Sequence, residues 1–474
     1  LKCFQWNLVM WLHVQRHLVR SSSRLLSTAP TVTRISPSGL FGPFGSGGEV
    51  TGTVSKGFEG VRSAFEQNFA ARLELGAQLV VRHKGEVVVD LCGAAPECVG
   101  YSPKTLQCVY SSGKNMEAVA MAMLVDRGVV SYDDPVVQHW PEFGKHGKDA
   151  VTVADVLRHE GGVPYLANPE GPDDTSLDFI VSPSDVLDVS SLEKKIEGAV
   201  RAPPGGHRCY HAVTRGFVLG GILRRVDPQG RSIGRFIKEE ICEPLGITFF
   251  CGIPEHQQGE FEFADMTQIP MMYNIPFEVL PALAGVGCPQ LASAFKVFNK
   301  KNPITRQTVE WLKHPIKPNF NNSPLGRALE ISSAGMFANA RSMAKVNAAF
   351  AGDGSIEGVR LLSSEGVARA VAKTQVATDV ALDTFMGFSQ GGFCRFSDCF
   401  QQGQPPLMHP DDKSAMENFT GWGGWGGSTS LFDREREVVV AYAMNAMSNY
   451  VFGGPRTRPI LVEVNKALNK SSSQ

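Results

Sequence analysis

The spacing of hydrophobic residues predicts a helix followed by a hairpin where the regular part of the chain begins. From Phe58 onward, apolar residues recur every three or four positions, as on one face of an amphipathic helix, at Val61, Ala64, Phe65, Phe69 and Leu73. Residues 76–94 form two short β-rich runs on either side of His83-Lys84-Gly85. Two such runs around a short turn predict a β-hairpin.

A strand, a turn and a second helix are predicted for residues 106–128. Gly128 stands where the glycine that ends a helix is expected, and the apolar stripe of this helix consists of Met116, Val119, Ala120, Met123 and Leu124. Another helix is expected between Thr152, whose hydroxyl can cap its first turn, and Gly161-Gly162. A further helix is predicted over 340–352.

The remaining pattern predicts an α/β fold with a helical insertion. The C-terminal part ends in a predicted hairpin at 428–445 and a helix from about Pro459, whereas residues 151–325 are predicted to form helices and long irregular connections. We therefore expect residues 55–150 plus 326–470 to make one α/β domain. Residues 151–325 are expected to make a mainly helical domain inserted into it.

The composition is that of an ordinary soluble globular protein. The 474 residues are 43% hydrophobic and 20% charged, and 46 Lys and Arg oppose 47 Asp and Glu, for a net charge of -1. A protein whose main partner is nucleic acid needs an excess of cations on one face, so this balance argues against that class. No apolar run approaches the roughly 20 residues that cross a bilayer, so no transmembrane segment is predicted.

The cysteines and histidines do not indicate metal chemistry. The ten cysteines include no C-x-x-C pair and no Cys/His cluster with zinc spacing, and neither H-x-H nor H-E-x-x-H occurs. We therefore predict no metal and no cofactor. The cysteines are expected to be buried free thiols in a reducing compartment.

The first 50 residues are predicted to be a presequence or a disordered arm. The first acidic residue is Glu49, and the cations before it are Lys2, Arg16, Arg20, Arg24 and Arg34. This Arg-rich, Ser-rich and acid-poor composition is typical of a mitochondrial transit peptide, and a cytoplasmic location is the alternative if the segment is an arm or a gene-model artefact. Residues 36–48 are expected to be a linker. Because the chain begins with Leu1, we expect its natural start to lie upstream.

Two serine-hydrolase motifs occur, and the first, G-x-S-x-G at 387–391, is predicted to be coincidental. In hydrolases this motif follows a strand and is followed at once by a helix. Here residues 391–400 contain two glycines and several aromatic residues, which favour a strand or a loop. Ser389 is therefore not expected to be a nucleophile.

The second motif, S-x-x-K, has to be judged by its surroundings because it occurs four times, starting at 111, 191, 293 and 342. The copy at 191 overlaps a predicted capping box of Ser190 and Glu193, which indicates a helix start. The copies at 293 and 342 fall inside helical patterns, where a serine hydroxyl is expected to bond a backbone carbonyl. The copy at 111 differs from all three.

Ser111 opens the helix that carries Lys114. A serine in the first turn of a helix lies at the positive end of the helix dipole, beside unpaired N–H groups that can stabilise an oxyanion. Lys114, three residues on, lies on the same helix face. Burial would lower the pKa of Lys114 and allow it to accept the Ser111 proton. Taken alone, the pair also fits an N-capping serine and a surface lysine.

Two later segments supply candidate partners. A Pro/Gly loop presents Tyr210, whose phenol is expected to ionise more easily beside a lysine and could serve as general base in acylation and general acid toward the leaving group. In residues 421–427, glycines surround Trp422 and Trp425, so that backbone can approach a ligand and the indoles can form apolar walls. Taken singly, each segment also fits a packing role.

Together, these three segments resemble the serine β-lactamase and penicillin-binding-protein superfamily, and specifically the class C β-lactamases and family VIII carboxylesterases. Ser111-Ser112-Gly113-Lys114 is similar to its S-x-x-K motif, Tyr210-His211-Ala212 to Y-x-N, and Trp422-Gly423-Gly424 stands at the place of K-T-G. Similar flanking stretches follow in the same order at 131–144, 151–164, 331–346 and 426–433. The resemblance covers about residues 55–468. It implies the fold of β-lactamases and DD-peptidases, an antiparallel sheet flanked by helices.

The resemblance also implies roles for individual residues. Ser111 would be the nucleophile, and Lys114 and Tyr210 the proton-transfer pair. The N–H groups of Ser111 and Trp425 would form the oxyanion hole, in a substrate site made by Trp422, Gly423, Gly424 and Trp425. Ala212 replaces the asparagine that contacts substrate in β-lactamases, and Trp422 replaces the lysine that pairs with a β-lactam carboxylate, so anionic β-lactams are expected to bind weakly. Family VIII esterases are similar in carrying Trp-Gly-Gly at this place.

The sequence thus predicts a serine hydrolase that cleaves a small, neutral, apolar ester or amide through an acyl-enzyme on Ser111. Acyl transfer to an alcohol or amine would use the same intermediate and stays open. A true β-lactamase is another alternative. So is a catalytically weak or inactive scaffold, because a filament-forming mitochondrial protein belongs to the same superfamily. The oligomeric state is also left open.

Overall fold

The computed structural model describes residues 47–166, 181, 183–203, 205–268, 320–382, 384–401, 412–448 and 454–471. The predicted arm therefore lies outside the described residues except for its last four, and the first strand already begins at Glu49. The S-x-x-K copy at 293 also lies outside them.

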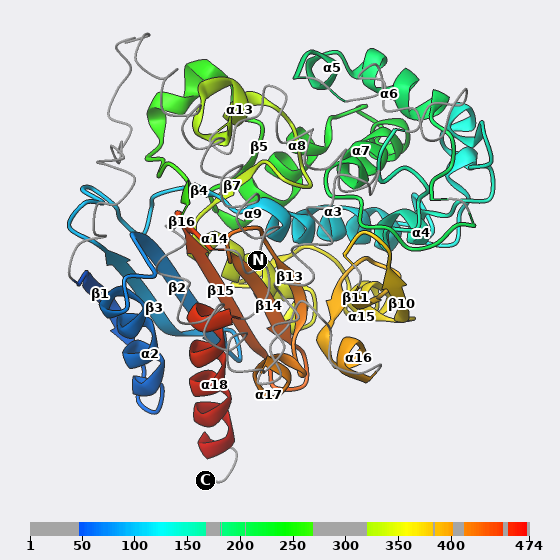
Figure 1. Cartoon of the computed structure of the whole chain (residues 1–474). Helices are drawn as coiled ribbons and strands as arrows, with labels where there is room; N and C mark the ends of the chain where they lie inside the picture. The colour runs from blue at the N-terminus through cyan, green and yellow to red at the C-terminus, as the bar shows by residue number, and fades with distance from the viewer. Residues whose placement is uncertain are drawn as a thin grey trace, which may run out of the picture. The chain divides into compact units, whose positions relative to one another are not determined.

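A nine-stranded antiparallel sheet forms the centre of the fold (Figure 1). Its strands lie in the order β1-β3-β2-β15-β14-β13-β12-β11-β10. Strand β15 pairs along its whole length with residues 77–83 of β2, which joins the two ends of the described chain in one sheet. The antiparallel sheet that the resemblance implied is confirmed. The strands span β1 Glu49–Val54, β2 Gly76–His83, β3 Glu86–Ala94, β10 Gln375–Asp379, β11 Thr384–Phe388, β12 Cys394–Arg395, β13 Thr420–Gly423, β14 Thr429–Asp433 and β15 Val438–Met444.

Smaller sheets complete the described strands. One has the order β4-β7-β5, and two others are the pairs β16-β6 and β8-β9. The three-stranded sheet matters for the site, because it brings segments far apart in the sequence to the residues just before Ser111. These strands span β4 Gln107–Cys108, β5 Phe249–Cys251, β6 Thr267–Gln268, β7 Met336–Ala338, β8 Ser355–Ile356, β9 Val359–Arg360 and β16 Ala446–Met447.

Two hydrophobic cores lie on the two faces of the large sheet, because alternate residues of a strand point to opposite faces. Leu79 and Val81 of β2 belong to the core that contains residues of α2 (Glu59–Ala70) and α18 (Gly454–Ser471). Val80 belongs to the other core, with α3 (Lys114–Asp126) and α14 (Ala340–Ala351). Figure 1 shows α2 and α18 packed side by side in front of the sheet.

The other described helices are short, except for α7. In Figure 1, α4 to α7 gather at the upper right, beyond the edge of the large sheet. The described part of residues 151–325 is mainly helical, and its assignment to a separate domain stays a prediction. These helices span α4 Val153–Leu157, α5 Pro183–Leu187, α6 Val189–Gly198, α7 Thr214–Val226, α8 Ile233–Ile237, α9 Glu243–Leu245, α13 Pro324–Ala328, α15 Ser364–Val371, α16 Phe396–Gln401 and α17 Asp412–Met416, with single turns η1 Tyr110–Gly113, η2 Val136–Gln138, η3 Pro141–Gly144, η5 Lys238–Cys242, η6 Glu255–Glu260 and η7 Phe320–Asn322.

The hairpin and the first helix match the predictions, and the second helix differs in one respect. The β2–β3 hairpin turns at Lys84 and Gly85, with φ of 51° and 82°, the left-handed pair that suits the twist of the two strands. Helix α3 is buried on every side from Lys114 to Val125, instead of on one stripe, because the large sheet, α7, α8 and α15 all pack around it. This central position is what buries Lys114.

Three helix ends test the expected boundaries. Thr152 caps α4 in the capping geometry expected of it. The expected capping box of Ser190 and Glu193 is wrong, because the Asp188 carboxylate caps α6 and Glu193 pairs with two arginines of α7 instead. Helix α18 begins at Gly454, so Pro459 lies inside it and does not mark its start.

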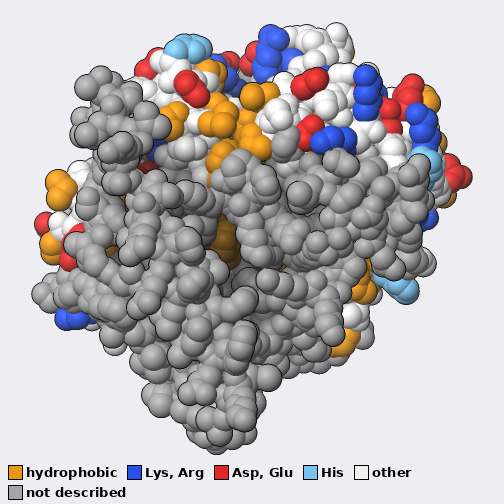
Figure 2. All heavy atoms as spheres, turned by 45° about the horizontal axis from the view of Figure 1, so that its top comes forward, with side chains coloured by type: hydrophobic (Ala, Val, Ile, Leu, Met, Phe, Trp, Pro, Cys, Tyr) orange, Lys and Arg blue, Asp and Glu red, His pale blue; other side chains and the backbone are white. Residues whose placement is uncertain are grey.

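The cysteines of the described ranges are free and buried, as expected. Within the same ranges, no three His, Cys, Asp or Glu side chains are grouped so that they could hold a metal ion. No helix found there has both the length and the apolar character to cross a membrane. Figure 2 shows one face of the molecule, where Lys and Arg side chains alternate with Asp and Glu around a strip of hydrophobic ones. The part of that face that the structure describes therefore carries charges of both signs.

Candidate active site

Ser111 lies in a tight turn between β4 and α3. The preceding residue, Tyr110, has φ of 45°, a conformation that is uncommon for a residue with a side chain. The turn is fixed by its backbone, because Val109 N–H donates to Met336 O of β7 (2.9 Å) and Ser112 N–H donates to Val109 O (3.1 Å). Ser111 is partly exposed, whereas Ser112 is buried. The turn therefore presents one hydroxyl outward.

The hydroxyl of Ser111 contacts both predicted partners. Lys114 Nζ lies 3.2 Å and Tyr210 OH lies 2.7 Å from Ser111 Oγ. Both distances are in or next to the range of a direct hydrogen bond. The structure thus brings together three side chains that come from the turn η1, from the first residue of α3 and from the loop before α7. An oxygen flanked by an amine and a phenol can lose its proton to one and accept a hydrogen bond from the other.

Lys114 has no exposed side-chain surface, and its amine is held by backbone. Nζ donates to the carbonyl oxygens of Ala212 and Ser333, both at 2.8 Å. Burial lowers the pKa of Lys114 to about 7, although the nearby Glu117 carboxylate opposes this shift. Carbonyl oxygens can only accept hydrogen bonds, so a neutral amine that donates to both turns its lone pair toward Ser111. Lys114 is therefore suited to accept the serine proton.

Tyr210 behaves differently from the prediction. Its ring packs 4.6 Å from the ring of His159, and its hydroxyl donates to Ser111. Burial raises the pKa of Tyr210, and the hydrogen bond with Ser111 and the charge of Arg215 only partly offset this. The expectation that the phenol ionises easily is therefore wrong, since desolvation outweighs the neighbouring cations. Tyr210 keeps its proton near neutral pH and is suited to donate it.

Two buried histidines, which the sequence analysis missed, hold the Tyr210 loop. His211 N–H donates to His159 Nδ1 (2.9 Å). His211 Nδ1 donates to Cys209 O (2.6 Å), and its Nε2 accepts from Val163 N–H (3.1 Å). Burial lowers the pKa of both rings, of His211 to about 3, so both stay neutral. The signal available in the sequence for His159 was its place just before Gly161-Gly162, at the end of a predicted helix.

Asp379, at the end of β10, supports the same loop and was also missed. Its side chain is fully buried and accepts hydrogen bonds from the N–H groups of Ala381 and Leu382, both at 3.0 Å. It also interacts with the backbone N–H of Tyr210, and burial raises the pKa of Asp379 to about 6. No local motif marked this residue, because it meets Tyr210 only through the edge of the sheet.

The glycine-rich segment lies directly against the Ser111 turn. A Cβ atom on Gly424 would stand 2.2 Å from Val109 O and 2.3 Å from Ser428 Oγ, so only glycine allows this approach. Ser428 Oγ donates to Val109 O (2.7 Å) and lies 2.9 Å from Ser112 Oγ. Within the described ranges, the N–H groups of Ser111 and Trp425 donate to no other residue. Both amides are free to bind a ligand oxygen.

The two tryptophans of this segment differ in what they do. Trp422 is fully buried, its Nε1 donates to Gly392 O (2.9 Å), and its ring stacks on Phe388 (5.3 Å). Its ring lies 5.9 Å from Lys114 Nζ, so Trp422 supplies apolar surface beside the amine from within the core. Gly423 and Gly424 are buried as well, whereas Trp425 is partly exposed and packs its edge on Tyr110 (5.4 Å).

Ser389 and Ser342, two other serines singled out in the sequence, are buried and bonded to backbone. Ser389 is fully buried in the turn from β11 to β12, where its Oγ accepts from Phe393 N–H (3.1 Å) and no helix follows at once. The interpretation of G-x-S-x-G as coincidental is confirmed. Ser342 accepts a hydrogen bond from Thr248 N–H (3.1 Å), where a bond to a carbonyl was expected.

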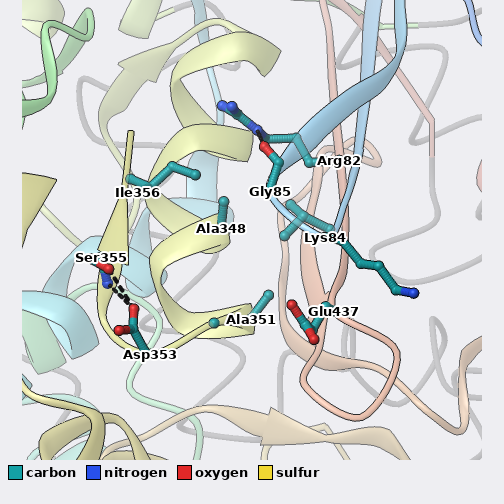
Figure 3. Close-up of a pocket in the computed structure, with 11 residues that line it drawn as sticks. Arg82, Lys84, Gly85, Ala348, Ala351, Asp353, Ser355, Ile356 and Glu437 are labelled. Atoms are coloured by element: carbon teal, nitrogen blue, oxygen red, sulfur yellow. Dashed lines mark hydrogen bonds between the residues drawn. The ribbon is translucent and has the colours of Figure 1, made fainter. Parts of the chain in front are cut away.

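A pocket at the opposite end of β2 and β15 does not compete as a hydrolytic site. It has a volume of about 270 Å³ and includes Arg82, Lys84, Asp353 and Glu437 (Figure 3). Its one serine, Ser355, donates its hydroxyl to the carboxylate of Asp353. A hydroxyl bound to a carboxylate, with neither a lysine amine nor a phenol against it, is not arranged as an acyl-transfer nucleophile.

Comparisons with known proteins agree over most of the chain. The family model described as Beta-lactamase matches residues 65–464. The curated protein esterase/beta-lactamase LipL of Mycobacterium tuberculosis (strain ATCC 25618 / H37Rv) is 28% identical over 336 residues, 68% of each chain. Two solved structures cover 88% of this chain and 100% of their own: a penicillin-binding protein homologue from Caulobacter crescentus (30% identical, TM-score 0.67) and a family VIII carboxylesterase (26% identical, TM-score 0.69).

Proposed function

The chain belongs to the beta-lactamase family and is a serine hydrolase, and we propose that it is an esterase whose acyl-enzyme forms on Ser111. The observation that carries the proposal is the contact of one partly exposed hydroxyl with a buried amine at 3.2 Å and a phenol at 2.7 Å. A nucleophile with an adjacent base and a second proton carrier is the arrangement that acyl transfer requires.

In the proposed acylation, Ser111 Oγ attacks the carbonyl carbon of the ester. Lys114 accepts the serine proton, because its pKa of about 7 leaves the amine largely neutral at slightly alkaline pH. The carbonyl oxygen becomes an oxyanion that the N–H groups of Ser111 and Trp425 would bind. The C–O bond to the leaving group then breaks, Tyr210 gives its proton to the leaving alcohol, and Lys114 returns a proton to Tyr210.

Deacylation repeats these steps with water in place of the alcohol. Water attacks the acyl carbon and loses a proton to the Lys114 and Tyr210 pair. The bond between the acyl carbon and Ser111 Oγ breaks, and the serine regains its proton. The products are a carboxylic acid and the free enzyme, and the scheme uses neither metal nor cofactor. An alcohol or amine that reached the acyl-enzyme before water would give acyl transfer.

The proposed substrates are neutral esters, not anionic β-lactams. Trp422 stands where a cation would be needed, and the cations Lys114 and Arg215 are buried and already bonded. LipL is named both an esterase and a beta-lactamase, so β-lactam hydrolysis is the second candidate. A comparison of kcat/KM for p-nitrophenyl butyrate with kcat/KM for nitrocefin measures the preference.

The identity of the nucleophile is tested by covalent labelling. A serine-reactive fluorophosphonate is expected to label the protein once, on the peptide that contains Ser111, and to abolish ester hydrolysis in proportion. Ser389→Ala is the matched control, because it removes the serine of the G-x-S-x-G motif and is expected to be labelled at the wild-type rate. Label on another residue would contradict the proposal, and a protein that neither reacts nor hydrolyses esters would favour the scaffold alternative.

The proposed role of Tyr210 is tested with leaving groups of different basicity. Tyr210→Phe keeps the ring against His159 and removes only the hydroxyl. We expect kcat/KM for alkyl esters to fall about 10²-fold, in the range of general acid catalysis. The loss should be smaller for p-nitrophenyl esters, because p-nitrophenolate leaves without a proton. An equal loss for both ester classes would argue against Tyr210 as the acid.

A further inference from the structure

Below Lys114 lies an ion pair that has no exposed surface. The Glu117 and Arg215 side chains are each 0% exposed, and Glu117 Oε2 lies 3.1 Å from Arg215 Nε. Glu117 follows Lys114 by three residues on α3, so both side chains lie on one helix face. Arg215 lies near the start of α7, the helix that follows Tyr210. The pair therefore joins the two segments that carry the proposed catalytic groups.

The glutamate binds the segment that binds the lysine. Glu117 Oε1 accepts the hydroxyls of Ser332 (2.7 Å) and Ser333 (2.6 Å), and the carbonyl of Ser333 accepts Lys114 Nζ. Gly216 N–H donates to Ser333 Oγ (2.9 Å), and a Cβ on Gly216 would stand 2.4 Å from Glu117 Oε1. The Glu117 carboxylate thus fixes one of the two carbonyls that hold the amine.

The arginine binds the lysine's own backbone and the floor of the site. Arg215 Nη2 donates to Lys114 O at 3.2 Å. Its guanidinium carbon lies 5.0 Å from the Trp422 ring, which also lies 5.9 Å from Lys114 Nζ. Arg215 therefore places α7 and Trp422 at fixed positions around the amine.

Stability alone does not explain a pair of charges in this position. Taking two charges out of water costs about as much as their attraction returns, and well-packed apolar residues often serve as well. The two charges act on the lysine in opposite directions, since Glu117 raises and Arg215 lowers the pKa of Lys114. The other titratable groups that pack near the amine are Tyr210, His159 and His211, and all three are neutral near pH 7.

We propose that Glu117 and Arg215 are positioning residues for Lys114: the pair fixes the Ser333 carbonyl that binds the amine and the backbone of Lys114 itself, and its two charges balance each other at Nζ. This inference rests on the proposed function, in which Lys114 accepts the Ser111 proton. A single charge at this place would shift the protonation of the amine. Two opposite charges hold the surrounding segments with little net effect on it.

The test compares Glu117→Gln, Arg215→Met and the double variant with the wild type. For each protein, kcat/KM for p-nitrophenyl butyrate is measured against pH. The quantity compared is the position of the acid limb, the pH range in which kcat/KM rises as the base loses its proton. Glu117→Gln leaves the arginine unbalanced, so the limb should move to lower pH by roughly one unit. Arg215→Met leaves the carboxylate unbalanced, so the limb should move to higher pH by roughly one unit. The double variant should return to within about half a unit of the wild type. Shifts of the two single variants in the same direction, or no shift, would overturn the inference.

Two further variants keep the test decisive if the single variants do not fold. The double variant has no unpaired charge, and a folded double variant whose limb lies more than about one unit from that of the wild type would overturn the inference. Asp227→Asn is the matched control, because it breaks the buried Asp227–Arg231 pair just beyond the far end of α7. It is expected to lower stability and to leave the limb in place. A limb that moved with Asp227→Asn would show that breaking a buried ion pair anywhere in the chain has this effect.

Failure of this inference differs from failure of the proposed function. If the label does not map to Ser111, or if the acid limb persists in a Lys114→Met variant, the proposed function fails. If both results hold and the two single variants show no opposed shifts, only the role given to Glu117 and Arg215 fails.

Discussion

Ser111→Ala is expected to lower kcat/KM for p-nitrophenyl butyrate by about 10⁴-fold or more, because the oxygen that forms the acyl-enzyme is removed. The residual rate would come from bound water and from the N–H groups that face the carbonyl. The measurement is steady-state hydrolysis on purified protein, with circular dichroism and thermal unfolding to show that the variant is folded. The fold should persist, because Ser111 is partly exposed and the turn is held by backbone bonds of its neighbours.

Ser389→Ala and Ser112→Ala are the controls for this loss. Each removes a hydroxyl that lies in a different environment, one in the β11–β12 turn and one against Ser428. Ser389→Ala should keep the wild-type kcat, because its hydroxyl serves only the turn. Ser112→Ala should cost far less than Ser111→Ala. A Ser111→Ala variant that keeps more than a tenth of the wild-type activity would mean that the acyl group is carried elsewhere.

Lys114→Met is expected to lower kcat/KM by about 10³-fold at pH 8, in the range of general base catalysis, and to remove the acid limb of its pH profile. In the wild type the base must be unprotonated, so activity rises with pH through the pKa of Lys114, about 7, and then levels off. Below that pH, kcat/KM should fall roughly tenfold for each pH unit. Methionine has nearly the same length and no titrating group, so its remaining activity should be flat across this range.

Lys148→Met is the matched control, because Lys148 is also a fully buried lysine. Its amine donates to the carbonyls of Lys145, Glu197 and Ala199, and burial lowers the pKa of Lys148 to about 8. The substitution leaves carbonyls unpaired as Lys114→Met does, so both variants should be less stable. The acid limb should stay in place in Lys148→Met. If the acid limb disappeared in Lys148→Met and persisted in Lys114→Met, the base would be Lys148 and the assignment to Lys114 would be wrong.

The fold could be predicted well where local patterns decide it. The β2–β3 hairpin, α2, α14 and the β14–β15 hairpin all lie where the spacing of apolar residues indicated them. Alternation with period two and stripes with period three to four are set by the backbone geometry of a single segment. The cap of α6 was missed for a local reason as well, since Asp188 and Ser190 are both good capping residues and only the entry angle of the chain selects between them.

The chemistry of the site was harder to predict, because it depends on burial. The sequence indicated Ser111, Lys114 and Tyr210 and left the protonation of each open or misjudged it. Whether a phenol beside a lysine ionises is decided by how much water surrounds both, and Tyr210 is enclosed enough for its pKa to rise. The complete burial of Trp422 could not be predicted for the same reason, since nothing local shows that α3 and β11 pack against it.

The sequence by itself determined which side chains are available for catalysis: the S-x-x-K turn, the tyrosine loop and a glycine segment without a cation, each carried by a short stretch of chain. Only the tertiary structure decided what they can do there. The enclosed amine of Lys114, the protonated phenol, the two neutral histidines and the Glu117–Arg215 pair all depend on desolvation and on contacts between residues 52 to 319 positions apart. Desolvation and charge pairing depend on all the groups that surround a side chain in three dimensions. No short run of the sequence determines those surroundings.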